Sequence, residues 1–265
     1  MTNNSFSILI SIGGFTITKY AVCILFGACL AYLHGCYQFK KMGLDEHILS
    51  DYFLYVLLIG ILGARIWYVL MSLDYYAYHL SEVVAIWQGG LAIQGGLFAG
   101  LLFSYYFFKK KNISFLDAGD AIMPGVLIAQ ACGRWGNFFN HEAYGSEVTL
   151  AFLQKLHLPQ FIIEHMYING AYHHPTFLYE SLGNIIVFLV ITFIIRKYIK
   201  IQGIPFACYF IGYGIVRFPV EALRTDSLMF MGLKMAQVIS ILFIIVGIVM
   251  IILCVRRNKN AIYQN

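Results

Sequence analysis

Long apolar stretches recur along the whole chain, and they restrict its fold more than any other feature of the sequence. Crossing the hydrocarbon core of a bilayer takes a helix of about 20 predominantly apolar residues. Only 12% of the 265 residues are charged, about half the share that is typical of a soluble domain. The sequence therefore predicts an all-α, polytopic integral membrane protein that forms a single domain over residues 1–265. Its seven expected transmembrane helices lie near residues 18–37, 51–72, 91–108, 118–133, 177–195, 203–220 and 236–255.

The fourth of these stretches is the weakest, because it is short and contains Asp120, Pro124 and Gln130. Polar groups at membrane depth need partners inside the protein. We therefore expect neighbouring helices to shield this helix, or the helix to be tilted. The longest segment between apolar stretches lies near residues 146–176, and we interpret it as an outer loop.

Basic residues follow the first, third, fifth and seventh stretches. If seven helices alternate in direction, all of these residues lie on one side of the membrane, and an excess of Lys and Arg marks the cytoplasmic side. We therefore expect the N-terminus outside and the C-terminus in the cytoplasm. The basic clusters account for 11 of the 18 lysines and arginines: Lys40, Lys41, Lys109, Lys110, Lys111, Arg196, Lys197, Lys200, Arg256, Arg257 and Lys259.

The stretch CGRWGNFFNHEAYG, residues 132–145, gathers polar side chains at the outer end of the fourth stretch. An arginine at membrane depth costs a few kcal/mol on insertion scales, so Arg134 should face the bundle interior or a wet cavity. Asn137, Asn140 and Glu142 have the chemistry to bind hydroxyl groups of a ligand. The spacing of Asn137 and Asn140 also fits a helix-end cap, and this alternative stays open.

A second polar face is expected within YFIGYGIVRFPVEALR of the sixth stretch. Tyr213, Arg217, Glu221 and Arg224 stand at offsets of 0, 4, 8 and 11, so at ~100° per residue they share one face of a helix. Pro219 should kink or end that helix. Two inward arginines indicate an anionic ligand, and a phospholipid phosphate is the natural candidate at this depth. The alternative is an internal Arg–Glu pairing that only locks helices together.

Two further stretches stand out. WQGGLAIQGGLFAG, residues 87–100, contains the pair Gly96 and Gly100, whose spacing favours close helix packing. Gln94 is a polar group at the start of this otherwise apolar helix. HHPTFLYES, residues 173–181, begins the fifth helix with Pro175, a common position for proline, and His174 beside it is expected to be a cap or a surface residue.

Several of these motifs resemble one known family. GRWGNFFNHEAYG (133–145) resembles the signature of the prolipoprotein diacylglyceryl transferases, membrane enzymes that begin bacterial lipoprotein maturation. Nearly the whole chain takes part, through SIGGFTITKYAVCILFG, GARIWYVL, GGLAIQGGLFAG, HPTFLYE and GYGIVRFPVEALRTD. The resemblance implies seven helices with the N-terminus outside. It also implies transfer of a diacylglyceryl group from phosphatidylglycerol to the lipobox cysteine of a preprolipoprotein, which forms a thioether and releases glycerol phosphate.

The resemblance also implies roles for individual residues. Arg134 and Arg217 would clamp the lipid phosphate, and Arg65 and Asp120 would be structural or supporting. The family commonly has histidine where this chain has Gln94; because glutamine cannot take a proton at physiological pH, we expect Gln94 to hydrogen-bond a substrate within the catalytic site. The substrate-binding cavity would be lined by Tyr20, Asn137, Asn140, Glu142, Gly145, Tyr213, Glu221 and Arg224.

The expected location is the bacterial cytoplasmic membrane, with several passes and contact with its lipids. No metal, cofactor or nucleic acid is expected, since the histidines lack the HExxH spacing of a metal site and no nucleotide loop is present. Two other interpretations are open: a catalytically silent paralogue that still binds anionic lipid or a lipoprotein precursor, favoured only by Gln94, and a transporter or channel. No internal inverted repeat of the kind found in many transporters supports the latter.

Overall fold

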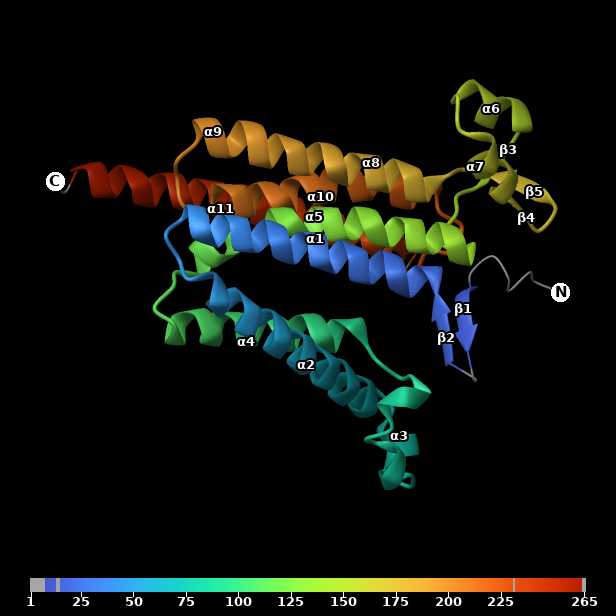
Figure 1. Ribbon diagram of the computed structural model, residues 1–265, viewed down its shortest axis with the longest axis horizontal. Coiled ribbons are helices and arrows are strands. Elements are labelled where there is room, and N and C mark those ends of the chain that lie inside the picture. The colour runs from blue at the N-terminus through green and yellow to red at the C-terminus, as the bar shows by residue number, and fades with distance from the viewer. Residues whose placement is uncertain (1–7, 13–14, 231, 264–265) are drawn as a thin grey trace. The chain divides into compact units, whose positions relative to one another are not determined.

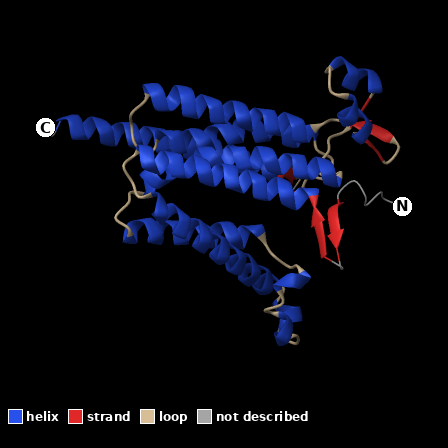
Figure 2. Cartoon of the chain, in the orientation of Figure 1, coloured by secondary structure: helices blue, strands red, loops and turns tan. Residues whose placement is uncertain are grey.

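The computed structural model describes residues 8–12, 15–230 and 232–263, and long helices dominate it (Figures 1 and 2). The chain divides into two compact units. Unit 1 comprises Met1–His34 with Gly119–Asn265, and unit 2 comprises Gly35–Ala118. Part of the expected outer N-terminus, residues 1–7, lies outside the described residues.

Unit 1 is a bundle of long helices. α10 packs against both α8 and α11, and α1 and α5 run alongside them (Figure 1). A π-helical turn, η3, joins α8 to the short α9 without a break. The helices are α1 (Lys19–Lys41, its residues up to 34 belonging to this unit), α5 (Phe115–Asn140, from residue 119), α8 (Thr176–Leu189), η3 (Val190–Ile195), α9 (Arg196–Tyr198), α10 (Ile204–Leu223) and α11 (Met235–Tyr263).

Short strands and helices complete unit 1. Residues 146–176, the segment expected to be an outer loop, contain a three-stranded antiparallel sheet in the order β3-β5-β4 and two short helices; their place outside the membrane stays a prediction. These elements are held by a small core, in which Leu153 and Ile162 pack with Phe138 and Phe177 from the adjoining helices. The elements are β1 (Ile8–Ile12), β2 (Phe15–Thr18), β3 (Glu147–Val148), α6 (Leu150–Lys155), α7 (Gln160–His165), β4 (Tyr167–Ile168), β5 (Ala171–His173), β6 (Met229–Phe230) and β7 (Leu233–Lys234).

α5 is longer and better shielded than its apolar stretch suggested. It was expected to end near residue 133, but it continues to Asn140, so most of the signature motif is helical. Asp120 accepts the backbone N–H groups of Gly203 and Phe206 at 2.7 and 2.9 Å and so caps the start of α10. Gln130 donates to the Tyr209 hydroxyl at 3.1 Å. These contacts confirm that neighbouring helices shield α5, and that Asp120 has a structural role.

Unit 2 is a tight helix pair. Its elements are α2 (Glu46–Met71), α3 (Leu73–Tyr76), η1 (Leu80–Glu82), η2 (Ile86–Gln88) and α4 (Ile93–Lys110). A Cβ on Gly63 would lie 2.3 Å from the Ala99 Cβ, and one on Gly96 would lie 3.0 Å from the Gly60 carbonyl oxygen. Gly96 is therefore a packing residue, as the spacing predicted, whereas a Cβ on Gly100 would lie at an ordinary 3.7 Å from the Val56 Cγ2.

Arg65 of α2 is buried and holds the segment between α3 and α4. Its guanidinium donates to four backbone carbonyl oxygens at 2.6–2.9 Å, those of Glu82, Val83, Gly89 and Gly90. Because all four acceptors are backbone groups, the contacts support the expected structural role of Arg65.

Among the residues that the structure describes, six helices are long and apolar enough to cross a membrane, which confirms the all-α, multi-pass class. They are Lys19–Lys41, Glu46–Met71, Phe115–Asn140, Thr176–Tyr198, Ile204–Leu223 and Met235–Asn258, and they coincide with six of the seven expected stretches. The remaining stretch, residues 91–108, forms α4, an 18-residue helix that is not among these six, because Gln94 and its terminal lysines lower its hydropathy. The count of seven spans and the direction of the termini stay predictions.

Candidate active site

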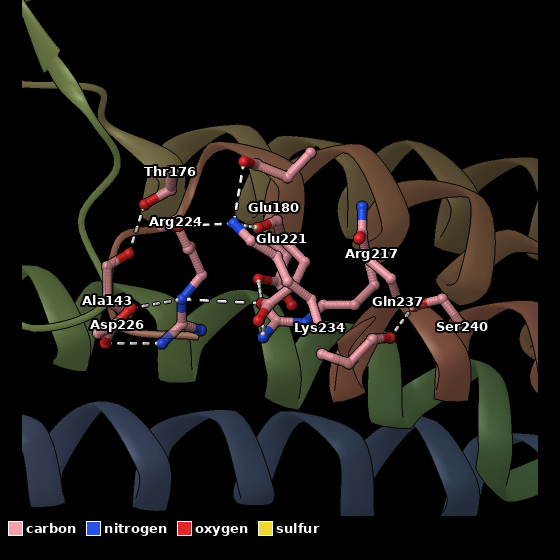
Figure 3. A network of polar contacts seen from close by, with 12 residues as sticks. Ala143, Thr176, Glu180, Arg217, Glu221, Arg224, Asp226, Lys234, Gln237 and Ser240 are labelled. Atoms are coloured by element: carbon pink, nitrogen blue, oxygen red, sulfur yellow. Dashed lines mark hydrogen bonds and ion pairs between the residues drawn. The ribbon is translucent and has the colours of Figure 1, made fainter. Parts of the chain in front are cut away.

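A buried group of ion pairs lies in unit 1, with Arg217 of α10 at its centre (Figure 3). Arg217 Nη1 lies 2.7 Å from Glu180 Oε2 on α8, and Arg217 Nη2 lies 2.6 Å from Glu221 Oε2 one helical turn away. The side chains of Glu180 and Glu221 are only 2% and 3% exposed. Such short charge-assisted bonds away from water are stronger than neutral hydrogen bonds. They hold the Arg217 guanidinium in one orientation.

Arg134 joins the same group from α5. Its Nε lies 3.1 Å from Glu180 Oε1, and its Nη1 donates to Asn137 Oδ1 at 3.1 Å. Among the described residues, neither Arg134 Nε nor Glu180 Oε1 has a hydrogen-bond partner, although both atoms are buried. The contact between them is thus a close ion pair with poor hydrogen-bond direction. One carboxylate, that of Glu180, is shared by arginines from two helices.

Arg224 extends the charged face to the end of α10. It donates through Nε and Nη2 to the two carboxylate oxygens of Asp226, both at 2.9 Å, and its Nε is 3.8 Å from Glu221 Oε2. Burial alone would raise the pKa of Asp226, but the bonds and charge of Arg224 bring that pKa below its usual value. The expected face of Arg217, Glu221 and Arg224 is therefore confirmed. α10 does not end at Pro219, since it continues to Leu223.

Lys234 of β7 fixes the end of the same helix. Its ammonium donates to the carbonyl oxygens of Glu221, Ala222 and Arg224 at 2.9, 3.1 and 2.8 Å. The last carbonyl groups of a helix have no partner within it, and a cation there also suits the helix dipole. Lys234 thereby fixes the backbone that carries two members of the charged face.

The residues after α5 are tied to this helix end. His141 and Ala143 both have positive φ angles, 55° and 59°, which are unusual for residues other than glycine. The Ala143 carbonyl accepts from the Thr176 hydroxyl at 2.5 Å, and its backbone N–H donates to Asp226 (Figure 3). Burial, and then the charge of His165, lower the pKa of His141. The signature motif and α10 are therefore fastened together.

Gly145 stands at the junction of three segments. It forms a β-bridge with Arg224, and its N–H donates to the His174 carbonyl at 3.0 Å. A Cβ here would lie 2.6 Å from the His174 Cβ and 3.1 Å from the Leu223 carbonyl oxygen. His174 is half-buried, which lowers the pKa of its ring, and its Nδ1 lies 3.2 Å from the Tyr179 hydroxyl. The packing explains why only glycine fits at position 145.

Two aromatic residues expected in the cavity lie beside the arginines or the signature helix. Tyr213 of α10 interacts with Arg134 and Arg217, and its ring stacks on Tyr209. Tyr20 of α1 packs against Gly136, where a Cβ would lie 2.7 Å from the Tyr20 Cδ2. Gly136 lies within α5 and provides room for this ring.

Three further predicted site residues, Asn140, Glu142 and Gln94, are not members of the ion-pair group described above. Asn140 is the last residue of α5, and its Nδ2 lies 3.4 Å from Glu142 Oε1 in an exposed contact. Gln94 is an exposed residue of α4 in unit 2. The structure therefore brings Arg134, Asn137, Tyr213, Arg217, Glu221 and Arg224 together in unit 1.

Glu180, Asp226 and Lys234 are members of this site that the sequence prediction omitted. The signal for Glu180 was available, because a glutamate in HPTFLYE lies at the start of an apolar helix and needs a buried partner. The pairing of Glu180 with both arginines matches the alternative of internal Arg–Glu contacts. This pairing does not use all the hydrogen-bond donors of the two arginines, since each guanidinium has five N–H donors.

The arrangement suits the binding of an anion at membrane depth. Three arginines face three carboxylates, and Lys234 adds a further positive charge. Charges held in a site of low polarity act more strongly than in water. Two guanidiniums fixed side by side could therefore stabilise a phosphate group and the charge that develops when it leaves.

Comparison with known proteins agrees with the motifs and the fold. The family model for prolipoprotein diacylglyceryl transferase matches residues 7–253. A phosphatidylglycerol–prolipoprotein diacylglyceryl transferase of Listeria innocua is 44% identical over 245 residues, covering 92% of this chain and 88% of the relative. A transferase of the same name from Staphylococcus aureus strain Newman is 44% identical over 243 residues, covering 91% and 86%. The match spans both units and every residue of the ion-pair group, so the chain belongs to the prolipoprotein diacylglyceryl transferase family.

Proposed function

We infer that this chain transfers the diacylglyceryl group of phosphatidylglycerol to the lipobox cysteine of a preprolipoprotein, the first step of bacterial lipoprotein maturation. The observation that carries the inference is the buried group in which Arg134 and Arg217 share the carboxylate of Glu180, in a multi-pass chain of this family. We place the protein in the bacterial cytoplasmic membrane, with its N-terminus outside and its C-terminus in the cytoplasm.

The reaction replaces a carbon–oxygen bond with a carbon–sulfur bond. The substrate thiolate attacks the diacylglyceryl carbon that carries the phosphate, and glycerol phosphate leaves with the electron pair of the broken bond. A free thiol has a pKa near 8.5 and must first lose its proton to a base. Gln94 cannot take that proton, so we assign it a hydrogen bond to a substrate.

The chain's own residues hold the lipid and stabilise the leaving group. Arg134 and Arg217 bind the phosphate, keep it in line with the attacking sulfur and favour its departure with negative charge. The other proposed residues shape the head-group cavity; they are Tyr20, Asn137, Asn140, Glu142, Gly145, Tyr213, Glu221 and Arg224.

A transfer assay tests this function directly. The purified protein is mixed with phosphatidylglycerol and a lipobox peptide, and the diacylglyceryl-thioether peptide is sought by mass spectrometry. We expect product from the wild type and little from Arg134→Ala or Arg217→Ala. Absence of product, with a relative active in parallel, would refute the transferase function.

One observation favours a second candidate, a lipid-binding paralogue without activity. Gln94 stands where the family commonly has a titratable histidine. Phosphatidylglycerol that is retained but never transferred would identify this alternative. Restored transfer in Gln94→His would show that the glutamine is the cause.

A further inference from the structure

Glu180 occupies an unusual position for a glutamate in an apolar helix. It lies in the first turns of α8, with its side chain only 2% exposed, between Arg134 of α5 and Arg217 of α10. Each of its two carboxylate oxygens faces a different guanidinium. The difference in geometry between these two contacts indicates the role of the side chain.

The two contacts of Glu180 differ in quality. Oε2 forms a hydrogen bond of 2.7 Å with Arg217, whereas Oε1 lies 3.1 Å from Arg134 Nε without a hydrogen bond to any described residue. Arg134 is also the more exposed of the two side chains, at 20% against 11%. Arg217 is thus held by two short hydrogen bonds to carboxylates, whereas Arg134 is held by the bond from its Nη1 to Asn137 and by a looser contact with Glu180.

Glu180 is not needed to hold α8 in place, because other contacts do so. Ser181 donates from its hydroxyl to the Ala131 carbonyl of α5 at 3.1 Å. On the other side, a Cβ on Gly183 would lie 2.6 Å from the Val216 Cγ1 of α10. α8 is therefore fixed to both neighbouring helices by packing and by the residue next to Glu180.

We propose that Glu180 is a positioning residue for the transfer reaction, which sets the separation and orientation of Arg134 and Arg217 and balances their charge until the lipid phosphate binds. The inference rests on the proposed function and adds to it an order of events. Arg217 is the fixed cation. Arg134 turns toward the incoming phosphate from a contact that is only partly made.

The variant Glu180→Gln keeps the shape of the side chain but removes its negative charge. It therefore separates the positioning of the arginines from the attraction between positive charge and the lipid phosphate. Arg134, Arg217, Glu180 and Glu221 carry two positive and two negative charges, so the variant leaves one positive charge in excess. The glutamine offers an oxygen to one guanidinium but turns an N–H₂ donor toward the other. We expect kcat to fall roughly 10- to 100-fold from misplacement of the arginines, while the Kd for phosphatidylglycerol in nanodiscs stays equal or falls.

Ser181→Ala provides the matched control, since it removes the neighbouring bond between α8 and α5 and leaves all charges in place. It should lower the melting temperature and keep kcat per folded molecule at the wild-type value. If Glu180→Gln does not fold, Glu180→Asp tests the same point, because the shorter carboxylate keeps its charge but cannot reach both arginines. We expect a lower kcat with an unchanged Kd for that variant.

The outcomes are distinguishable. A wild type that transfers nothing overturns the proposed function and this inference together. An active wild type, with a Glu180→Gln enzyme whose kcat per folded molecule is unchanged, overturns the positioning role alone. A fall in kcat matched by equal weakening of lipid binding also overturns it, because loss of the site as a whole would produce that result.

Discussion

Replacing Arg217 by lysine separates the charge of this residue from its shape. Lysine keeps the positive charge but presents one ammonium nitrogen in place of the guanidinium fork. In the structure two different Nη atoms of Arg217 reach two different carboxylates, at 2.7 Å for Glu180 and 2.6 Å for Glu221. One nitrogen cannot occupy both positions, so Arg217→Lys should lose one of the two contacts.

The contacts set the expected size of the effect. A hydrogen bond to a charged group contributes about 1.5–3 kcal/mol, and this is the loss of stability expected for Arg217→Lys. Arg217→Met removes the charge as well, and breaking a buried ion pair costs about 3–5 kcal/mol. We expect the lower end, because Glu180 keeps Arg134 at 3.1 Å and Glu221 keeps Arg224 at 3.8 Å.

The effect on transfer follows from the same geometry. If the lost contact also orients the phosphate in the transition state, 1.5–3 kcal/mol corresponds to a rate roughly 10- to 100-fold lower for Arg217→Lys. Removing the cation with Arg217→Met should lower kcat by roughly 100- to 1000-fold. The assay measures product formation at saturating phosphatidylglycerol, well below the melting temperature of each variant, so that all molecules are folded.

Two results would refute this reasoning. Wild-type kcat in a folded Arg217→Lys enzyme would show that charge suffices and that the fork is unimportant. Equal activity of Arg217→Lys and Arg217→Met would show that the charge itself plays no part, leaving Arg217 as a lock between helices.

Three further predictions concern the supports of the site. Lys234→Met removes the donor to three carbonyl groups at the end of α10 and should lower stability by about 1.5–3 kcal/mol, measured by thermal unfolding in detergent. Gly136→Ala places a Cβ 2.7 Å from the Tyr20 Cδ2; such overpacking costs about 1–3 kcal/mol, so both melting temperature and transfer should fall, and Tyr20→Ala should restore the melting temperature in the double variant. Burial is the main cause of the lowered pKa values of His141 and His174, so the unfolded chain binds protons first. We therefore expect the free energy of unfolding to be highest above about pH 6.5 and to decrease as the pH is lowered from there. The decrease should be smaller in a variant carrying glutamine at both positions.

The charged face of α10 shows how far sequence patterns reach. Offsets of 4 and 3 residues predicted that Arg217, Glu221 and Arg224 meet on one face, and the structure confirms it because these contacts stay within one helix. Glu180 lies on another helix, 37 residues from Arg217 in sequence. Helical periodicity indicates which face a residue occupies, but not which helix that face meets. The partner of Arg217 on α8 was therefore beyond prediction from spacing alone.

α5 shows the same limit for helix length. The hydropathy pattern placed the end of this helix near residue 133, because several of the residues beyond it are polar or glycine. The helix continues to Asn140 because its polar groups find partners inside the protein, as Arg134 does with Asn137 and Glu180. Hydropathy describes the preference of each residue for lipid or water. It does not account for a polar side chain whose hydrogen-bond and ion-pair partners are other residues of the protein.

The incomplete contact between Arg134 and Glu180 bears on why these charges exist at all. Buried ion pairs are weak evidence for stability, because well-packed apolar residues of similar volume are often equally or more stable. In a chain with 60% hydrophobic residues, apolar side chains could occupy the positions of these ion pairs. A group selected for stability alone would also close the contact between Arg134 Nε and Glu180 Oε1, yet these buried atoms have no hydrogen bond to any described residue. Arg134 is therefore the arginine whose donors can pass from a carboxylate to a phosphate at low cost.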